Sequence, residues 1–294
     1  MYRGRVWALG FLLTIYLVGI LLISSITLQA QNKPDKKKKH GSRPMELNAA
    51  INAKRFPLMW CRRLHFAFSP ETRPLIALVS FPGSGNTWLR YLLQQATGIY
   101  TGSVYADYGL MRYGFPAESV KNSSVCVVKT HEWGEEARKP FDRAVLLVRS
   151  PAAAILAEFN RQSAGHVGFA SPDKYMGKKG KSDWEQFVRT KLSYWSKLNL
   201  DWLYNFPGPL HIVLYEELVA NVNSTLRNLL DFLEIPITDD QMKCVLDRKE
   251  GIYRRKQRKL PLDPYTDRMK YSIEIEKAAV FDKIKLFNRE NQIN

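Results

Sequence analysis

The segment that most constrains the fold runs from Ser80 to Leu93, with the sequence SFPGSGNTWLRYLL. It joins an apolar, strand-like run, Leu75 to Val79, to a helical pattern through a loop of glycine and small residues. Glycine lets a backbone approach an anion without a Cβ clash, and the first turn of a helix offers unpaired N–H groups and a positive dipole end. The segment therefore predicts a strand, a phosphate-binding loop and a helix, with Gly83 and Gly85 allowing the close approach.

Three side chains of this loop add hydrogen-bond donors, namely Ser84, Asn86 and Thr87. An ATP-type phosphate loop also needs a lysine that reaches the terminal phosphates, and no lysine stands in this segment. A kinase or a GTPase is therefore disfavoured. A plain connection between a strand and a helix, with no ligand, is the simpler alternative for the loop taken alone.

Two further apolar runs end in polar residues. Val125 to Val128 is followed by Lys129 and His131, and Ala144 to Val148 is followed by Arg149. Ligands of open α/β sheets bind at the carboxyl ends of the strands. A histidine there can act as a general base, and an arginine beside a helix start can bind an anion. The simpler alternatives are a surface histidine and an arginine that pairs with a local carboxylate.

The order of apolar runs and helical patterns predicts the fold class. Runs near Leu75, Val125, Ala144 and His211 alternate with helical patterns at Thr87–Thr97, Ala152–Gln162, Trp184–Tyr204 and Ser224–Leu233. Such alternation is typical of a three-layer α/β domain with a mostly parallel central sheet. The Trp and Tyr residues between Trp184 and Tyr204 recur near helical spacing, which favours core packing over a sugar-stacking surface.

Together, these motifs resemble the sulfotransferase superfamily, whose members transfer a sulfuryl group from 3′-phosphoadenosine-5′-phosphosulfate (PAPS) to a hydroxyl or an amine. The matching segments, in the family's order, are Phe81–Trp88, Lys129–His131, Leu146–Pro151, Leu210–Leu233 and the basic run Arg248–Lys256. The form FPGSGNTWLRYLL is similar to that of the WSCD family, which carries it on a Golgi-type sulfotransferase domain. This chain has no Cys-rich WSC modules.

The resemblance implies a P-loop-like sulfotransferase fold in which His131 removes the acceptor's proton and Lys129 neutralises charge on the sulfonate and the departing phosphate. The residues that it implies for PAPS binding are Pro82, Gly83, Ser84, Gly85, Asn86, Thr87, Trp88, Arg149, Tyr215, Arg254 and Arg255. The expected acceptor is a carbohydrate, and the WSCD likeness suggests a sialylated glycan. No metal is expected. The alternative is a noncatalytic relative that binds a glycan or a nucleotide as a scaffold.

Two positions depart from the superfamily's pattern. Gly83 stands where the loop often carries Lys or Arg, a cation that stabilises the leaving phosphate. We expect Lys129 or Arg90 to replace it. Ala157 stands where a serine commonly follows the 3′-phosphate arginine, so this contact is expected from Ser150, Asn160 or Arg161.

The N-terminus predicts a membrane anchor, because Val6 to Leu28 is almost uninterrupted apolar sequence of about the length that crosses a bilayer. We expect a cytoplasmic tail at 1–5, a transmembrane signal anchor at 6–28, a basic stem at 29–44 and a luminal domain at 45–294. A signal cleaved near Ala30, which would give a secreted enzyme, is the alternative.

Two kinds of sequence signal bear on the orientation of the anchor, and they disagree. Lys36 to Lys39 follow the apolar stretch, which opposes a luminal C-terminus under the positive-inside rule. Two N-glycosylation sequons, at Asn122 and Asn223, are acceptors in the secretory lumen, and the likeness to Golgi-type enzymes agrees with them. We expect a single-pass type II protein of the Golgi membrane, glycosylated at both sites.

The net charge narrows the class of expected partner, and the cysteine content narrows the expected disulfides and metal sites. The net charge of +16 favours anionic ligands, and with a membrane anchor the expected partner is a glycan or glycoprotein rather than a nucleic acid. Three cysteines, Cys61, Cys126 and Cys244, fit neither a dense disulfide scaffold nor a zinc site. Cys126 is expected to be a buried thiol, whereas Cys61 and Cys244 either pair or stay free.

Overall fold

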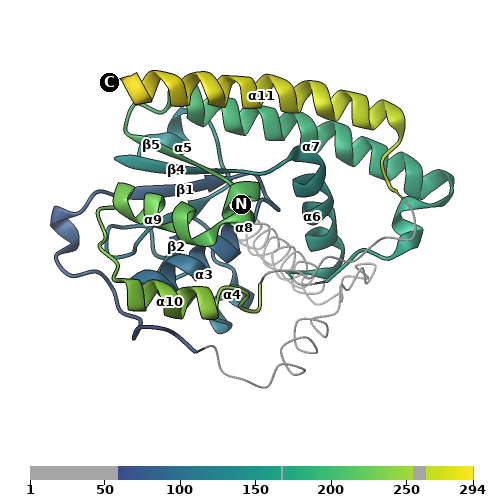
Figure 1. Cartoon of the computed structure of the whole chain (residues 1–294). Coiled ribbons are helices and arrows are strands. Elements are labelled where there is room, and N and C mark those ends of the chain that lie inside the picture. The colour runs from purple at the N-terminus through teal and green to yellow at the C-terminus, as the bar shows by residue number, and fades with distance from the viewer. Residues whose placement is uncertain (1–58, 167, 254–262, 294) are drawn as a thin grey trace, which may run out of the picture. The chain divides into compact units, whose positions relative to one another are not determined.

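The computed structural model describes residues 59–166, 168–253 and 263–293, which all lie in one compact unit, Arg43–Asn294. At its centre is a parallel sheet in the order β2-β3-β1-β4-β5 (Figure 1). Its strands are β1 (Ile76–Ser80), β2 (Gly102–Ser103), β3 (Val128–Thr130), β4 (Arg143–Val148) and β5 (Leu210–Leu214). The predicted α/β class with a parallel central sheet is confirmed.

Helices cover both faces of the sheet. One face carries α3 (Asn86–Thr97), α9 (Val222–Phe232) and α10 (Asp239–Asp247), and the other carries α6 (Pro151–Ala164), α7 (Gly177–Asn205) and α11 (Asp267–Ile293) (Figure 1). The shorter elements are α4 (Tyr108–Arg112), α5 (Glu135–Arg138), α8 (Tyr215–Ala220) and the 3-10 turns η1 (Pro70–Thr72) and η2 (Pro172–Tyr175). The domain therefore has three layers.

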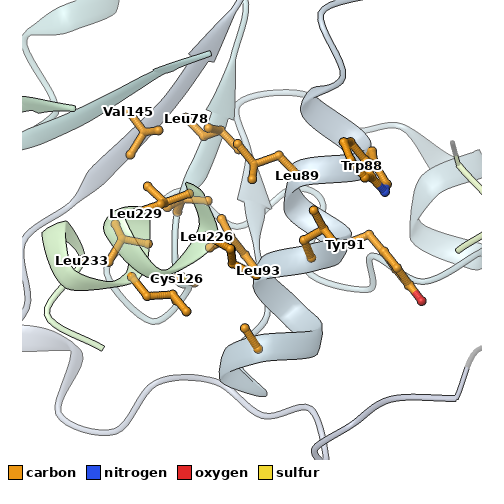
Figure 2. Packing of buried hydrophobic residues seen from close by; sticks show 14 of the residues in the cluster. Leu78, Trp88, Leu89, Tyr91, Leu93, Cys126, Val145, Leu226, Leu229 and Leu233 are labelled. Atoms are coloured by element: carbon orange, nitrogen blue, oxygen red, sulfur yellow. The ribbon is translucent and has the colours of Figure 1, made fainter. Parts of the chain in front are cut away.

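Strands β1 and β4 are buried on both faces, which is why they read as continuous apolar runs. Leu78 of β1 and Val145 of β4 pack against Leu89, Leu226 and Leu229 of the helices on one face (Figure 2). Neighbouring residues of the same strands point into the opposite core, which contains the buried side chains Val79, Leu146, Ile155, Trp195 and Trp202. The core assignment of the tryptophans in α7 is confirmed.

The register brings the ends of the strands to one edge. Val79 of β1 pairs with Thr130 of β3, and Ser80 pairs with Leu147 of β4. Since the strands are parallel, the segments that follow β1, β3, β4 and β5 all leave the sheet at its carboxyl edge. Ligands of open parallel sheets bind at this edge.

Several elements differ from the sequence prediction. The apolar run from Val125 contributes only Val128–Thr130 to the sheet, and α7 begins at Gly177, well before Trp184. The single helix expected after β5 is two helices, because the Asn221 side chain accepts a hydrogen bond from Ser224 N–H and caps α9. Helix α11 was not expected, although its buried residues Met269, Ile273, Val280 and Ile284 carry a helical signal.

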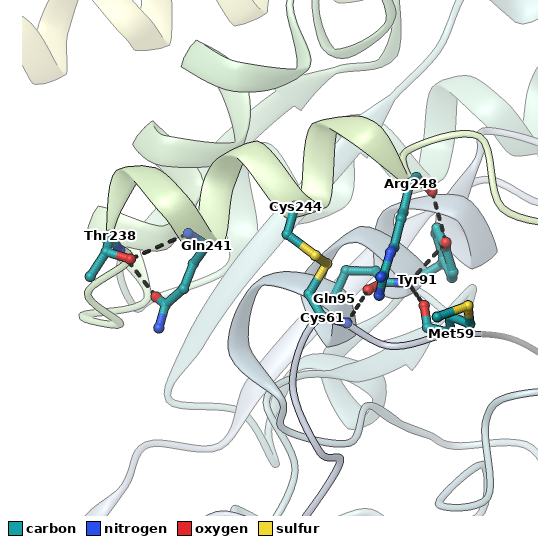
Figure 3. Close-up of a disulfide and its surroundings, with 8 residues drawn as sticks. All are labelled: Met59, Cys61, Tyr91, Gln95, Thr238, Gln241, Cys244 and Arg248. Atoms are coloured by element: carbon teal, nitrogen blue, oxygen red, sulfur yellow. Dashed lines mark hydrogen bonds between the residues drawn. A yellow bond between two sulfur atoms is a disulfide. The ribbon is translucent and has the colours of Figure 1, made fainter.

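Cys61 and Cys244 form a disulfide that ties α10 to the segment before the sheet (Figure 3). Their Cα atoms are 5.9 Å apart and the two residues are separated by 183 positions. Gln95 of α3 accepts from Cys61 N–H and donates to the Met59 carbonyl. Cys126 is the buried free thiol that was expected, and burial raises its pKa to about 12.

Some expectations fall outside the described residues, namely the anchor at 6–28, the stem at 29–44, and Arg254 and Arg255. Within 59–166, 168–253 and 263–293, no helix combines the length and the apolar character needed to cross a bilayer.

Candidate active site

A cavity of about 570 Å³ opens at the carboxyl edge of the sheet. Segments that follow four strands meet there: the loop after β1, His131 after β3, Arg149 after β4 and Tyr215 after β5. Of the predicted site residues, the cavity is lined by Pro82, Gly83, Gly85, Asn86, Thr87, Trp88, Lys129, His131, Arg149 and Tyr215. The fold thus brings together residues that the motifs placed far apart in the sequence.

The loop after β1 depends on two glycines with left-handed backbones. Gly83 has φ +86°, and a Cβ built on it would lie 2.3 Å from the Ala154 carbonyl oxygen of α6. Gly85 has φ +98°, and a Cβ there would lie 2.5 Å from the ring of Tyr215. Position 83 therefore has no room for the Lys or Arg that the superfamily's loop often carries there.

Helix α3 starts directly from this loop. Its first intrahelical bond runs from Leu89 N–H to Gly85 O, so Asn86 and Thr87 have no intrahelical partner for their N–H groups. The Asn86 amide nitrogen donates to Leu78 O and to Ser80 Oγ, each at 3.1 Å. Asn86 can therefore contribute its backbone N–H, not its side chain, to anion binding.

Ser84 is turned away from the cavity. Its side chain is buried, and among the described residues its Oγ has no hydrogen-bond partner. Its N–H bonds to the Phe81 carbonyl at 3.2 Å, which tightens the turn. Ser84 therefore shapes the turn of the loop through its backbone, whereas Thr87 lines the cavity.

His131 is held in one tautomer. Its Nδ1 lies 2.6 Å from the Ser80 carbonyl oxygen, and a carbonyl can only accept, so Nδ1 carries the proton and Nε2 carries the lone pair. Its backbone N–H donates to Tyr105 Oη at 3.0 Å, and its carbonyl accepts from Tyr194 Oη. Burial, reinforced by the nearby Lys129 ammonium, lowers the pKa of His131 to about 3. The imidazole is therefore neutral at physiological pH.

Lys129 points into the cavity from β3 and faces a buried carboxylate. Its Nζ lies 3.7 Å from Glu118 Oε1 and 5.5 Å from the ring centre of Tyr105. Burial and the Arg90 charge lower the pKa of Lys129 to about 8, although Glu118 opposes the shift. At pH 7 the ammonium form still predominates.

Arg90 does not reach the cavity. It is completely buried, and it donates through Nε and Nη2 to Thr101 at 3.0 Å. Its Nη2 also lies 2.7 Å from Glu118 Oε2. The suggestion that Arg90 replaces the missing loop cation is wrong, because the guanidinium is enclosed in the core, and Lys129 remains for that role.

Arg149 and Tyr215 form one unit with the loop. Arg149 Nη1 donates to Gly83 O at 2.9 Å, and the guanidinium lies 4.2 Å from the ring centre of Tyr215. Arg149 Nε is buried and has no hydrogen-bond partner within the described part of the chain. A buried donor without a partner is the kind of group that a bound anion would satisfy.

Helix α3 also contacts the late segment that leads to Arg254 and Arg255. Trp88 Nε1 donates to Lys249 O at 2.7 Å, and Tyr91 Oη donates to Arg248 O at 2.8 Å. Tyr253, close behind them in the sequence, lines the cavity. The described end of the basic run therefore lies beside the predicted donor loop.

Sequence reasoning missed part of the cavity wall. Tyr105, Asp107, His166, Phe169 and Tyr194 line it, and Asp107 Oδ2 is 2.8 Å from His166 Nε2. This contact, which outweighs the desolvation of the carboxyl, holds the pKa of Asp107 well below its usual range. Tyr105 and Asp107 lie in irregular chain without motif spacing, and Tyr194 follows the same helical periodicity as the core residues of α7.

Helix α6 supplies the wall beside Arg149. Ala157, Asn160 and Arg161 line the cavity, as two of the three proposed substitutes for the missing serine would require. Arg161 binds the Glu158 carboxylate through Nε and Nη2, at 2.7 and 2.8 Å. Ser150, the third candidate, is not in the cavity wall, and its N–H bonds to Glu216.

The two predicted glycosylation sites lie on the surface. The side chains of Asn122 and Asn223 are exposed. Asn122 Oδ1 accepts from Ser124, and Asn223 Oδ1 accepts from Arg227 on the next turn of α9.

Among the described residues, no group of three His, Cys, Asp or Glu side chains is placed to hold a metal ion.

The site combines a neutral imidazole, an ammonium group and helix N–H donors around one space. Such a set can bind a phosphate-like anion and accept a proton from a hydroxyl beside it. This chemistry fits transfer of an anionic group to an alcohol.

Comparison with known proteins identifies the family of this chain. The family model of the sulfotransferase domain matches residues 73–293. A WSCD family member of Aedes aegypti is 48% identical over 315 residues, covering 97% of this chain and 98% of that protein. One of Drosophila melanogaster is 58% identical over 207 residues, covering 70% of this chain and 65% of that protein. The crystal structure of mouse sulfotransferase SULT7A1 complexed with PAP covers 77% of this chain and 89% of that one, at 14% identity and a TM-score of 0.49. The family model and the Aedes aegypti relative show that this chain belongs to the sulfotransferase domain family, as a member of the WSCD type.

Proposed function

We propose that this chain transfers a sulfuryl group from PAPS to a hydroxyl of a carbohydrate. The observation that carries the proposal is the placement of His131, whose Nδ1–H is held by Ser80 O. Its Nε2 is thereby kept as a proton acceptor in the cavity that the phosphate-type loop also lines. The family supports the reaction class, and the pairing of a base with an anion site supports the direction of transfer.

In the proposed reaction, the acceptor oxygen forms a bond to sulfur while the bond between sulfur and the bridging phosphate oxygen breaks. The acceptor proton passes to His131 Nε2. The electron pair of the broken bond stays on the phosphate, where the Lys129 ammonium and the N–H groups at the start of α3 offset the new charge. The products are a sulfate ester and 3′-phosphoadenosine-5′-phosphate.

His131 is a weak base in the ligand-free protein, since its pKa lies near 3. A bound donor brings negative charge next to the imidazole, and nearby negative charge raises the pKa of a histidine. The donor would therefore make His131 more basic when the acceptor needs to be deprotonated.

For donor binding, we propose that Arg149 selects the 3′-phosphate and that Trp88 and Tyr215 flank the adenine. The buried Nε of Arg149 offers a donor that the described residues do not satisfy. Trp88 and Tyr215 lie edge to face, 6.0 Å between ring centres, at the cavity wall. Arg254 and Arg255 are proposed as further 3′-phosphate ligands on the strength of the motif.

For the acceptor, we propose a glycan, with a sialylated glycan as the first candidate. The remaining wall contains both aromatic rings and hydrogen-bonding side chains, among them Tyr105, Asp107, Asn160, Phe169 and Tyr194. Such a mixture suits a sugar, which has both apolar faces and hydroxyl groups. We also propose that the domain is luminal and anchored in the Golgi membrane. The Cys61–Cys244 disulfide supports the luminal placement, because disulfides form and persist in oxidising compartments.

The test is calorimetric titration of the full chain with 3′-phosphoadenosine-5′-phosphate, using ATP as the competing nucleotide. We expect Arg149→Ala to weaken binding about 10- to 100-fold, the loss of a charged hydrogen bond. Arg227→Ala, which removes a surface arginine of α9, should bind like the wild type. Binding no tighter than that of ATP would refute the proposed donor.

Turnover then separates an enzyme from a scaffold. The full chain is incubated with ³⁵S-labelled PAPS and a sialylated glycoprotein, before and after sialidase treatment. We expect transfer that His131→Ala abolishes and that His211→Gln, a change in β5 outside the cavity, retains. Donor binding without transfer to any glycan would favour the noncatalytic alternative, and transfer retained by His131→Ala would refute the base.

A further inference from the structure

Beneath the cavity lies a row of three charged side chains from separate segments. Arg90 belongs to α3, Glu118 to the turns before β3, and Lys129 to β3 itself. Glu118 stands between the two cations, with Oε2 at 2.7 Å from Arg90 Nη2 and Oε1 at 3.7 Å from Lys129 Nζ. The exposed fractions of the side chains are 0% for Arg90, 0% for Glu118 and 8% for Lys129.

The row is fixed at its inner end. Arg90 donates to the side chain and the carbonyl of Thr101, and its guanidinium lies 4.4 Å from the ring centre of Phe115. The turn that carries Glu118 is closed by a bond from its N–H to Phe115 O at 3.0 Å. The carboxylate thus has one rigid partner, and its second oxygen faces Lys129.

The net charge of these three side chains sets the charge that the cavity presents to a ligand. Two cations and one carboxylate leave a single net positive charge, and of the three residues only Lys129 lines the cavity. Arginine keeps its proton under all ordinary conditions. If Glu118 were neutral, two buried cations would face each other, and the lysine is the one that can lose its proton.

We infer that Glu118 is a positioning residue for Lys129. It keeps the Lys129 ammonium charged and directed into the cavity, so that a site without a loop lysine still presents one cation to an anionic ligand. The inference deepens the proposed function, and it rests on that function only for the use of the charge in sulfuryl transfer. Glu118 itself touches neither donor nor acceptor.

Other charged groups near Lys129 either favour its charged form, as Glu118 does, or disfavour it. Asp107, from the start of α4, favours the ammonium, whereas Arg161 of α6 and Arg90 disfavour it. His131 follows two residues after Lys129, just beyond the end of β3, and is neutral at physiological pH. Of the two carboxylates that favour the ammonium, Glu118 acts more strongly than Asp107.

The test measures the protonation of Lys129 directly in the ligand-free full chain. Trace labelling with acetic anhydride over a pH series, read by mass spectrometry, gives the midpoint of Lys129, because only the uncharged amine reacts. We expect a midpoint near 8 in the wild type and at least one pH unit lower in Glu118→Gln. A drop of one pH unit would raise the uncharged fraction, and with it the labelling at pH 7, about fivefold.

Two variants serve as references. Glu118→Asp keeps the charge but moves it away from Lys129 Nζ by one methylene, so its midpoint should lie between those of Glu118→Gln and the wild type. This variant replaces Glu118→Gln if the latter does not fold. Glu276→Gln makes the same chemical change at the α7–α11 interface, where Glu276 accepts from Ser196, and should leave Lys129 unchanged.

The outcomes separate this inference from the proposed function. An unchanged Lys129 midpoint in folded Glu118→Gln, or in Glu118→Asp when that is the folded variant, overturns the inference whether or not the chain transfers sulfate. A lowered midpoint supports it even if no turnover is found, in which case the proposed function alone fails. Where turnover is found, we expect the alkaline limb of the kcat profile to move down with the midpoint.

Discussion

Gly83 offers the sharpest quantitative test of the loop geometry. A left-handed backbone costs a residue with a Cβ about 1–2 kcal/mol. At Gly83 a Cβ would also lie 2.3 Å from Ala154 O and 2.9 Å from Glu158 N, both backbone atoms of α6. Displacing packed backbone adds about 1–3 kcal/mol. We therefore expect Gly83→Ala to lower the free energy of unfolding by about 2–5 kcal/mol.

Gly177 is the matched control, because its φ is +66° and a Cβ there would meet nothing within 4 Å. Gly177→Ala should cost only the backbone contribution of about 1–2 kcal/mol. Urea unfolding followed by circular dichroism measures both, and melting temperatures should fall by about 2–4 °C per kcal/mol. Equal losses in the two variants would refute the steric reading of the loop.

The same geometry predicts the effect of restoring the superfamily's cation. Gly83→Lys introduces a Cβ at the same place, so it should destabilise the chain at least as much as Gly83→Ala. We expect it to weaken binding of 3′-phosphoadenosine-5′-phosphate rather than strengthen it, measured by the same titration. Tighter binding in Gly83→Lys would show that the loop can rearrange around a side chain.

Three further predictions concern stability and processing. Replacing Cys61 and Cys244 by Ser should lower the free energy of unfolding by about 2–5 kcal/mol, and dithiothreitol should lower the wild-type melting temperature similarly; a melting temperature insensitive to reductant would contradict the disulfide. Folding lowers the pKa of His131 from 6.5 to about 3. Between these pH values the imidazole is protonated in the unfolded chain but neutral in the folded one. The free energy of unfolding should therefore fall by up to about 1.4 kcal/mol for each pH unit of acidification in this range. His131→Gln should flatten that decline in urea unfolding, and identical slopes would disprove the shift. Asn122→Gln and Asn223→Gln should each remove one glycosidase-sensitive step in gel mobility when the chain is made in secretory cells, and mobility unchanged in both variants would argue against luminal glycosylation.

The elements nearest the site were the ones that sequence reasoning could locate. Buried parallel strands such as β1 and β4 are continuous apolar runs, and the residues that follow them must lie at one edge. This is why Lys129, His131 and Arg149 could be expected at one edge of the sheet from the sequence. Tyr215 was expected there only because its segment resembles the family's later strand and helix.

The remainder depended on tertiary contacts that leave no local pattern. Glu118 and Asp107 come from turns and a helix start, and nothing in their spacing indicates that Asp107 lines the cavity or that Glu118 contacts Lys129. The left-handed Gly83 reads like any loop glycine until α6 is packed against it. Position 90 was misassigned because an arginine on an amphipathic helix is usually exposed, whereas here the guanidinium lies in the core, where it donates to Thr101 and pairs with Glu118.

The disulfide places a condition on how the chain matures. Ribosomes add about 5–20 residues per second, so the 183 positions between Cys61 and Cys244 take roughly 10 to 40 seconds to make at those rates. During this interval Cys126 is the thiol that Cys61 meets first. Cys126 is buried in the folded chain, next to β3. We therefore expect docking of this segment into the sheet to favour oxidation of Cys61 with Cys244 over oxidation with Cys126.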